Sequence, residues 1–178
     1  MKGRDHTLHK RSNPVDAGTP VAEAIRVLLL ADDVDMTARC EALLFAAARA
    51  DHVERTIRPA LERGAIVLTD RFIDSSLAYQ GVARGLGVEQ VEAFNMWATD
   101  GLVPDVTIML DLPIGTSVMR EGENDRMENE GQLFQARVRR GLMELAARRP
   151  DRYTVIDASG PIEQVADLVW AALPDQWR

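Results

Sequence analysis

A short apolar run leads directly into a charged pair and then into a helix over residues 65–81, AIVLTDRFIDSSLAYQG. Ile66–Thr69 has the pattern of a strand that is buried on both faces, as strands of parallel sheets are. Ligands of such sheets bind beyond the carboxyl ends of the strands, where Asp70 and Arg71 follow. The pair predicts either a site, with Asp70 on a hydrated cation and Arg71 on a phosphate, or a plain salt bridge at a strand end.

The same alternation of strands and helices continues along the chain. Further strands are predicted at Val106–Leu110 and Tyr153–Ile156. Helices are predicted over residues 20–30, 36–63 (bent or broken near Pro59), 74–80, 88–99, 113–120, 133–148 and 161–173. Strands that alternate with helices of ten or more residues form parallel βαβ units. The predicted fold is therefore α/β, with a parallel sheet and helices on both of its faces.

Composition narrows the class of protein. A chain of 178 residues can bury one hydrophobic core without disulfide support. Its single cysteine, Cys40, stands in an apolar helical pattern, which favours a buried thiol in a reducing compartment, so we expect a cytoplasmic protein. No apolar run has the length of a membrane span. The net charge of −7 argues against nucleic-acid binding, so local arginines must hold any anionic ligand.

Between about residues 18 and 172 the sequence resembles the bacterial thymidylate kinases, in the order and spacing of that family's segments. The matching segments are GTPVAEAIRVLLL, EALLFAAARADHVERTIRPALERG, IVLTDRFIDSSLAYQG, GLVPDVTIMLD, DRMENEGQLFQARVRRGLMELA and YTVIDAS. The resemblance implies a P-loop nucleoside monophosphate kinase fold, with a kinase domain over residues 18–178. It also implies a cytoplasmic homodimer that transfers the γ-phosphoryl group of ATP to dTMP with Mg²⁺, with no nucleic-acid or membrane partner.

Phe45 and Arg49 are four residues apart on one predicted helix, so they share a face and could clamp a flat base. The ring would stack on the base, and the guanidinium would donate to a carbonyl oxygen. The resemblance assigns this pair to thymine. From the residues alone, the favoured interpretation is that Phe45 is a core aromatic and Arg49 a solvated charge on the helix surface.

The resemblance gives roles to the residues after the first strand as well. It makes Arg71 the catalytic clamp on the monophosphate and Asp70 the carboxylate on the magnesium side. Ser76 is placed at the base edge, and Tyr79 and Gln80 near the sugar and base. A tyrosine ring against the sugar could exclude a ribose hydroxyl. Without the resemblance, Ser76 could simply cap a helix and Tyr79 could be a half-buried surface ring.

Residues 121–131 resemble the mobile lid that closes over ATP phosphates and excludes water. Arg126 is the predicted catalytic cation at the transferring phosphoryl group, and Arg120 is the second candidate. The segment is also rich in acidic residues, so it could be only a solvated loop.

The ATP-binding loop of this class, G-x-x-x-x-G-K followed by Ser or Thr, does not occur in these 178 residues. Residues 1–17 are predicted to be a poorly structured segment, and the domain is expected to be N-terminally shortened. In the family the strand before that loop lies between the strands that correspond to Ile66–Thr69 and Val106–Leu110. We therefore expect these two strands to pair directly or the domain to be destabilised.

This absence leaves two functions open. The first is a thymidylate kinase in which the isolated chain has little or no activity, because ATP phosphates lack their cradle. The second is a non-catalytic dTMP-binding or assembly protein that derives from such a kinase.

Overall fold

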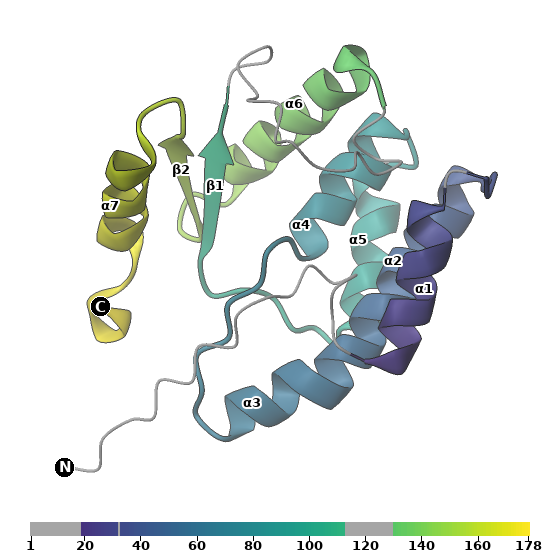
Figure 1. Cartoon of the computed structure of the whole chain (residues 1–178), viewed down its shortest axis with the longest axis horizontal. Helices are drawn as coiled ribbons and strands as arrows, with labels where there is room; N and C mark the ends of the chain where they lie inside the picture. The colour runs from purple at the N-terminus through teal and green to yellow at the C-terminus, as the bar shows by residue number, and fades with distance from the viewer. Residues whose placement is uncertain (1–18, 32, 113–129) are drawn as a thin grey trace.

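The computed structural model describes residues 19–31, 33–112 and 130–178 of the chain (Figure 1). The predictions for residues 1–17, for helix 113–120 and for most of the lid, including Arg120 and Arg126, lie outside these residues. The helices are α1 (Pro20–Leu30), α2 (Ala38–His52), η1 (Val53–Ile57), α3 (Arg58–Glu62), α4 (Ile73–Ser76), η2 (Leu77–Ala83), α5 (Val88–Ala98), α6 (Gln132–Arg148), α7 (Ile162–Ala172) and η3 (Asp175–Trp177). The strands are β1 (Thr107–Asp111) and β2 (Tyr153–Asp157).

The two strands pair in parallel, with Thr107 opposite Tyr153 and Asp111 opposite Asp157. Helix α6 connects them and contacts both β2 and the helix η2, while α7 follows β2 and packs against it (Figure 1). This βαβ unit confirms the predicted α/β class with a parallel sheet.

The prediction of a strand at Ile66–Thr69 is wrong. Residues 65–69 are extended, but in the described part of the chain the sheet consists of β1 and β2 only. The predicted direct pairing with the strand at Val106–Leu110 is therefore also wrong. Apolar β-branched residues favour extended backbone, but a strand forms only where a neighbour accepts and donates its backbone hydrogen bonds.

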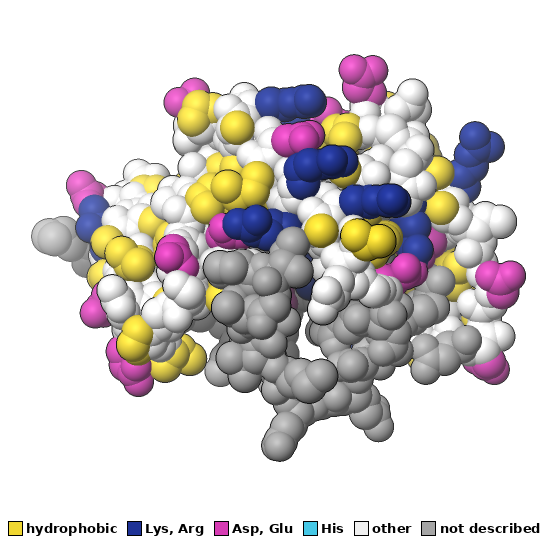
Figure 2. All heavy atoms as spheres, turned by 90° about the horizontal axis from the view of Figure 1, so that it is seen from above, with side chains coloured by type: hydrophobic (Ala, Val, Ile, Leu, Met, Phe, Trp, Pro, Cys, Tyr) yellow, Lys and Arg dark blue, Asp and Glu magenta, His cyan; other side chains and the backbone are white. Residues whose placement is uncertain are grey.

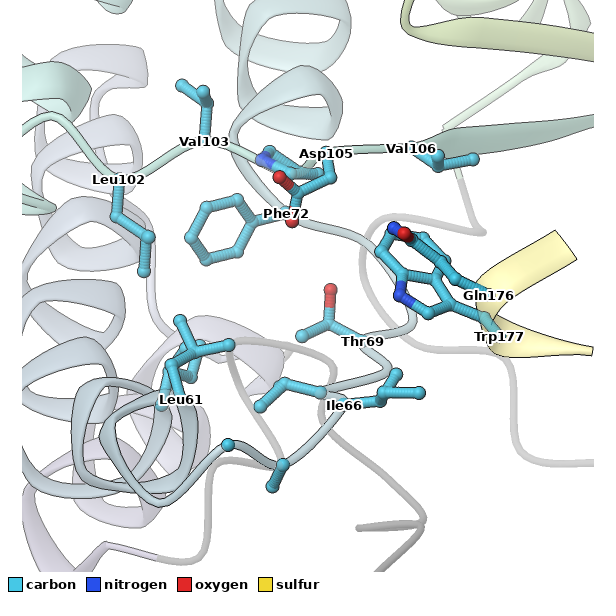
Figure 3. A pocket seen from close by; sticks show the side chains of 15 residues that line it. Leu61, Ile66, Thr69, Phe72, Leu102, Val103, Asp105, Val106, Gln176 and Trp177 are labelled. Atoms are coloured by element: carbon cyan, nitrogen blue, oxygen red, sulfur yellow. The ribbon is translucent and has the colours of Figure 1, made fainter. Parts of the chain in front are cut away.

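A cavity of about 480 Å³ lies between this extended segment and the chain that leads into β1 (Figure 3). Ile66 and Thr69 line one side, Val103 and Val106 line the other, and Trp177 closes one end. Protein interiors are normally close-packed, and side chains around such a space lose dispersion contacts. The expectation of a destabilised domain stays a prediction.

The main hydrophobic core lies on the helical side of the molecule instead, among η1, α4, η2, α5 and α6, and includes the first residue of β2. Its buried members are Val53, Ile57, Phe72, Ile73, Leu77, Val91, Leu145, Ala146 and Tyr153. The helices α4 and η2, which carry part of the predicted site, are therefore anchored in the largest apolar cluster of the described chain, while Ala48 of α2 packs with Ala22 of α1 in a separate, smaller cluster. In that part of the chain, no helix is long and apolar enough to cross a bilayer.

Local sequence signals explain several helix boundaries. Thr19 caps α1 by accepting a hydrogen bond from the Ala22 backbone N–H at 3.2 Å, and Pro20 occupies the first helical position, as predicted. Pro59 does not end its helix. Instead the helix widens into the π-helical segment η1 just before it and continues as α3, because the wider turn accommodates a residue without an N–H.

The prediction that Cys40 is buried is wrong, because this thiol is exposed. Cys40 lies in the first turn of α2, and the adjacent Glu41 and Ala42 occupy the buried face of that turn. The apolar pattern that suggested burial belongs to the later turns of the helix.

A buried polar cluster ties α4 to the start of β2. The Asp74 carboxylate, 6% exposed, accepts hydrogen bonds from the Tyr153 hydroxyl and, at 2.5 Å, from Arg152. Burial, followed by the contact with Asp74, raises the pKa of Tyr153, so its hydroxyl remains a donor. The cluster joins residues that are 78 and 79 positions apart in sequence.

We expect Asp74→Ala to lower the free energy of unfolding by about 3 to 5 kcal/mol, because it leaves a largely buried guanidinium without its partner. Tyr153→Phe removes one neutral donor and should cost only about 1 kcal/mol. Urea unfolding followed by circular dichroism measures both variants. Equal, small effects of the two would show that the carboxylate does not anchor α4.

His52, at the end of α2, is 3% exposed, and burial lowers its pKa below the ordinary value. Above the pKa of the unfolded chain, near 6.5, the neutral ring contributes its full stability, which is lost as the pH falls through the lower folded-state pKa. We expect the Tm to fall from about pH 7.5 to about pH 5.5 and His52→Gln to flatten this dependence. An unchanged pH profile in the variant would rule out His52 as the responsible group.

Candidate functional site

The predicted site residues lie on two facing helical surfaces, one on α2 and one on α4 and η2. Glu41, Phe45 and Arg49 follow one another at four-residue spacing on α2 and therefore share a face. Ser76, Gln80 and Arg84 have the same spacing across α4 and η2. Hydrogen bonds join Arg49 to Ser76, and Glu41 to both Gln80 and Arg84, so the two surfaces face each other.

Arg49 is 1% exposed, so the alternative of a solvated surface charge is wrong. Its guanidinium donates to the Ser76 hydroxyl at 3.0 Å, to the Phe72 carbonyl oxygen at 3.2 Å and to Oδ1 of Asn95. It also lies over the Phe72 ring, 5.5 Å from the centroid. Burial lowers the pKa of Arg49 to about 10, which leaves the side chain charged at neutral pH.

The acceptors of Arg49 are all neutral, and within the described residues its Nε–H has no hydrogen-bond partner. A buried cation normally satisfies its donors, because each unmade hydrogen bond in the interior is costly. The arrangement therefore holds a charged group rigidly and leaves one of its buried N–H groups without an acceptor.

Sequence reasoning missed Asn95 as a partner of Arg49. Asn95 is 0% exposed on α5, and its amide donates to the Val91 carbonyl oxygen at 2.8 Å, which leaves Oδ1 to face Arg49. An available signal was the position of this asparagine on the apolar face of its helix, four residues after the buried Val91.

Phe45 lies on α2 between two residues that form hydrogen bonds across the site, one turn after Glu41 and one turn before Arg49. Its ring is half-buried and lies outside the described clusters of buried core residues. This position agrees better with a ring that can meet a ligand than with a core aromatic.

Glu41 forms the other end of the site. Its buried carboxylate accepts a hydrogen bond from Gln80 Nε2 at 2.9 Å and pairs with Arg84 Nη2 at 3.1 Å. Arg84 also pairs with Glu130 at 2.5 Å and lies 4.7 Å from the centroid of the Phe134 ring. Although burial lowers the pKa of Arg84, the two carboxylates hold it above its ordinary value. Arg84 is thus a bridge between elements rather than a free solvated charge.

Asp70 and Arg71 are exposed at the end of the extended segment 65–69. Arg71 has a φ of +65°, in the left-handed region that non-glycine residues seldom adopt. Its guanidinium lies 5.1 Å from the centroid of the Tyr79 ring, and Tyr79 meets Phe134 edge to face at 6.0 Å. Strained backbone of this kind is common at functional sites, and sequence reasoning did not predict it.

Basic side chains gather on the face toward which β1 points, as Figure 2 shows from above. At that end of β1, Arg139 binds both oxygens of Asp111, at 2.6 and 2.8 Å, and lowers the pKa of this carboxyl. The carboxyl end of the strand thus carries a paired charge that sequence reasoning did not identify.

The exposed carboxylate of Asp70 fits a magnesium ion that a nucleotide carries. In the described ranges, no group of three or more His, Cys, Asp and Glu side chains could hold a metal ion. Mg²⁺ usually binds through one or two carboxylates together with phosphates and water. Asp70, one exposed carboxylate beside Arg71, could supply such a contact.

The structure thus brings Phe45, Arg49, Ser76 and Gln80 onto two facing surfaces and stacks Arg71 on Tyr79. Asp70 precedes Arg71 in the same turn. The arrangement offers an aromatic face, a fixed guanidinium and a second guanidinium at its edge, which suits a flat, polar base with an attached anion.

Comparisons with known proteins identify the family of the chain. The family model described as thymidylate kinase matches residues 6–169. A thymidylate kinase of Bifidobacterium longum (strain NCC 2705) is 52% identical over 161 residues, which cover 88% of this chain and 76% of the relative. A thymidylate kinase of Desulforudis audaxviator is 46% identical over 171 residues, which cover 94% of this chain and 76% of the relative. One of Pseudomonas putida strain GB-1 is 45% identical over 175 residues, which cover 96% of this chain and 83% of the relative.

These matches extend over most of the chain and include both helical surfaces of the site. The chain belongs to the thymidylate kinase family.

Proposed function

We propose that the facing surfaces of α2 and of α4 and η2 bind dTMP, with the thymine between Phe45 and Arg49. The observation that carries this proposal is the buried guanidinium of Arg49, which is fixed by neutral acceptors from two other elements. These hydrogen bonds use three of its five N–H groups. A remaining N–H can donate to a thymine carbonyl oxygen, while the half-buried Phe45 ring stacks on the base.

In this proposal Arg71 binds the phosphate of dTMP at the exposed edge of the same site. Its guanidinium lies over the Tyr79 ring, which orients it without removing its charge. An arginine that is fixed in this way can bind two phosphate oxygens at once. Tyr79 then lies close to the sugar, where its ring would exclude a ribose hydroxyl.

The ATP side of the reaction rests on other residues. We assign Asp70 to the Mg²⁺ that accompanies ATP, and Arg126 and Arg120 to the transferring phosphoryl group, although the two arginines lie outside the described residues. The 178 residues contain no glycine-rich phosphate loop of the kinase type. These residues alone are therefore expected to bind dTMP and to transfer little or no phosphoryl group.

A second candidate function is a dTMP-binding or assembly protein without catalysis. It is favoured by the same absence of a phosphate loop and by the segment 65–69, which is in no sheet of the described residues. In either function a cytoplasmic location and a homodimer stay predictions. The exposed apolar side chains of Leu43 on α2 and Trp97 on α5 are of the kind that a second copy could cover.

Phe45→Ala should weaken the binding of both dTMP and thymidine, because the stacking surface is lost. We expect a loss of roughly tenfold, since stacking of one base on an aromatic ring contributes about 1 to 3 kcal/mol. Arg71→Ala should weaken the binding of dTMP by roughly tenfold or more and leave the binding of thymidine unchanged, because only dTMP carries the phosphate. Isothermal titration calorimetry with the two ligands separates these effects.

Arg55→Ala is the matched control for these variants, because Arg55 is an exposed arginine of η1 that pairs with Asp51 away from the site. It should bind both ligands as the unaltered chain does. If Arg71→Ala weakened the binding of thymidine as much as the binding of dTMP, the assignment of this residue to the phosphate would be wrong.

A coupled assay with dTMP and ATP tests the expected lack of transfer. We expect calorimetry to detect dTMP binding and no ATP binding, and turnover to be lower by many powers of ten than for a kinase with the loop, because positioning of the phosphates dominates such catalysis. The thymidylate kinase of Bifidobacterium longum is the positive control. Robust turnover by the 178 residues would contradict this prediction.

A further inference from the structure

We propose that Glu41 is a positioning residue that makes the site select thymine over cytosine, by fixing the orientation of the Gln80 amide. The proposal rests on the dTMP site proposed above and adds to it a residue that would not touch the nucleotide. Its basis is the buried contact between the two side chains on the facing surfaces of α2 and η2.

The chemistry of the contact permits one orientation of the amide. Gln80 Nε2 donates to Glu41 Oε1 at 2.9 Å, and the two residues are 2% and 1% exposed. An ionised carboxylate only accepts hydrogen bonds, so the glutamine must turn its NH₂ group toward it. Among the described residues this is the single hydrogen bond of the Gln80 side chain, and the amide oxygen takes no part in it. The NH₂ group is thus directed at the carboxylate, and the amide oxygen is the group that stays available to a ligand as an acceptor.

The carboxylate is itself held in place. Arg84 contacts both of its oxygens, at 3.3 and 3.1 Å, and a second carboxylate, Glu130, binds Arg84 from the other side. The charge of Glu41 is therefore balanced, and its position does not depend on Gln80.

The fixed amide lies one turn after Ser76, which is in contact with Arg49. The donor of Arg49 and the acceptor of Gln80 therefore lie one helical turn apart on the same side of the facing surfaces. Thymine presents a carbonyl acceptor at C4 beside an N3–H donor, which matches this pair. Cytosine presents an amino donor at C4 beside an N3 acceptor, which opposes both. Sites that must leave a buried polar group unpaired reject a ligand strongly.

The test measures dTMP, dCMP and dUMP binding by calorimetry in the unaltered chain and in Glu41→Gln. A glutamine at position 41 can donate or accept, so it no longer dictates the orientation of the Gln80 amide. We expect the ratio of Kd for dCMP to Kd for dTMP to fall roughly five- to tenfold, the effect of one hydrogen bond. The ratio for dUMP to dTMP should not change, because uracil and thymine share the same hydrogen-bonding edge.

Glu130→Gln is the matched control, because Glu130 binds Arg84 but does not contact Gln80. It should leave both ratios unchanged. If Glu130→Gln lowered the dCMP ratio as much as Glu41→Gln does, the effect would act through the charge of Arg84, and the proposal would be overturned. An unchanged dCMP ratio in a folded Glu41→Gln protein would overturn it as well.

Gln80→Met provides a second route that leaves Glu41 and its pair with Arg84 intact. It should lower the dCMP ratio as much as Glu41→Gln does, and the double variant should lower it no further, because both changes remove one interaction. Additive effects of the two substitutions would overturn the proposal. An unchanged ratio of Kd for dCMP to Kd for dTMP in Gln80→Met would overturn it as well. If Glu41→Gln does not fold, the result for Gln80→Met decides the case alone. If the unaltered chain bound none of the nucleotides, the dTMP site itself would be refuted. That result is distinct from dTMP binding with an unchanged ratio of Kd for dCMP to Kd for dTMP in the variants, which would refute only the role of Glu41.

Discussion

The buried guanidinium of Arg49 is the interaction on which the site depends. A buried charge is tolerated only when hydrogen bonds replace its hydration, so its acceptors must be held in place. Here they come from the turn into α4, from α4 itself and from α5, and the core cluster fixes all of these elements. One cation from α2 therefore sets the relative positions of three helices, and the same constraint orients the donor that a base can meet.

Local rules explain which parts of this structure could be predicted from the sequence. The cap at Thr19, the four-residue spacing of Phe45 and Arg49 and the parallel βαβ unit depend on neighbours in sequence or on periodicity. The partners of Arg49 and Glu41 lie 23 to 46 residues away and are chosen by tertiary packing. The left-handed backbone of Arg71 has the same origin, since no turn signal precedes it.

The segment Ile66–Thr69 shows how a correct pattern can give a wrong element. Its apolar residues demand burial, and residues 65–69 are extended, but pairing is a property of two backbones rather than of one sequence. Among the described residues, β1 finds its partner in β2, and the space beside residues 64–69 is the cavity of Figure 3. The pattern thus identified an apolar segment, but it could not identify which other part of the chain packs against that segment.

The two halves of the proposed site differ in what holds them, and this difference separates binding from catalysis. The dTMP half consists of side chains on helices that buried hydrogen bonds join, from α2 to α4, η2 and α5, so its donors and its aromatic face are preorganised and little ordering entropy is lost when a ligand binds. The ATP half needs a backbone cradle that these 178 residues do not encode. Phosphoryl transfer involves little covalent chemistry by the protein and depends on placing both phosphates in line. A chain with one half intact can therefore keep specific recognition of the nucleotide while losing almost all of the rate.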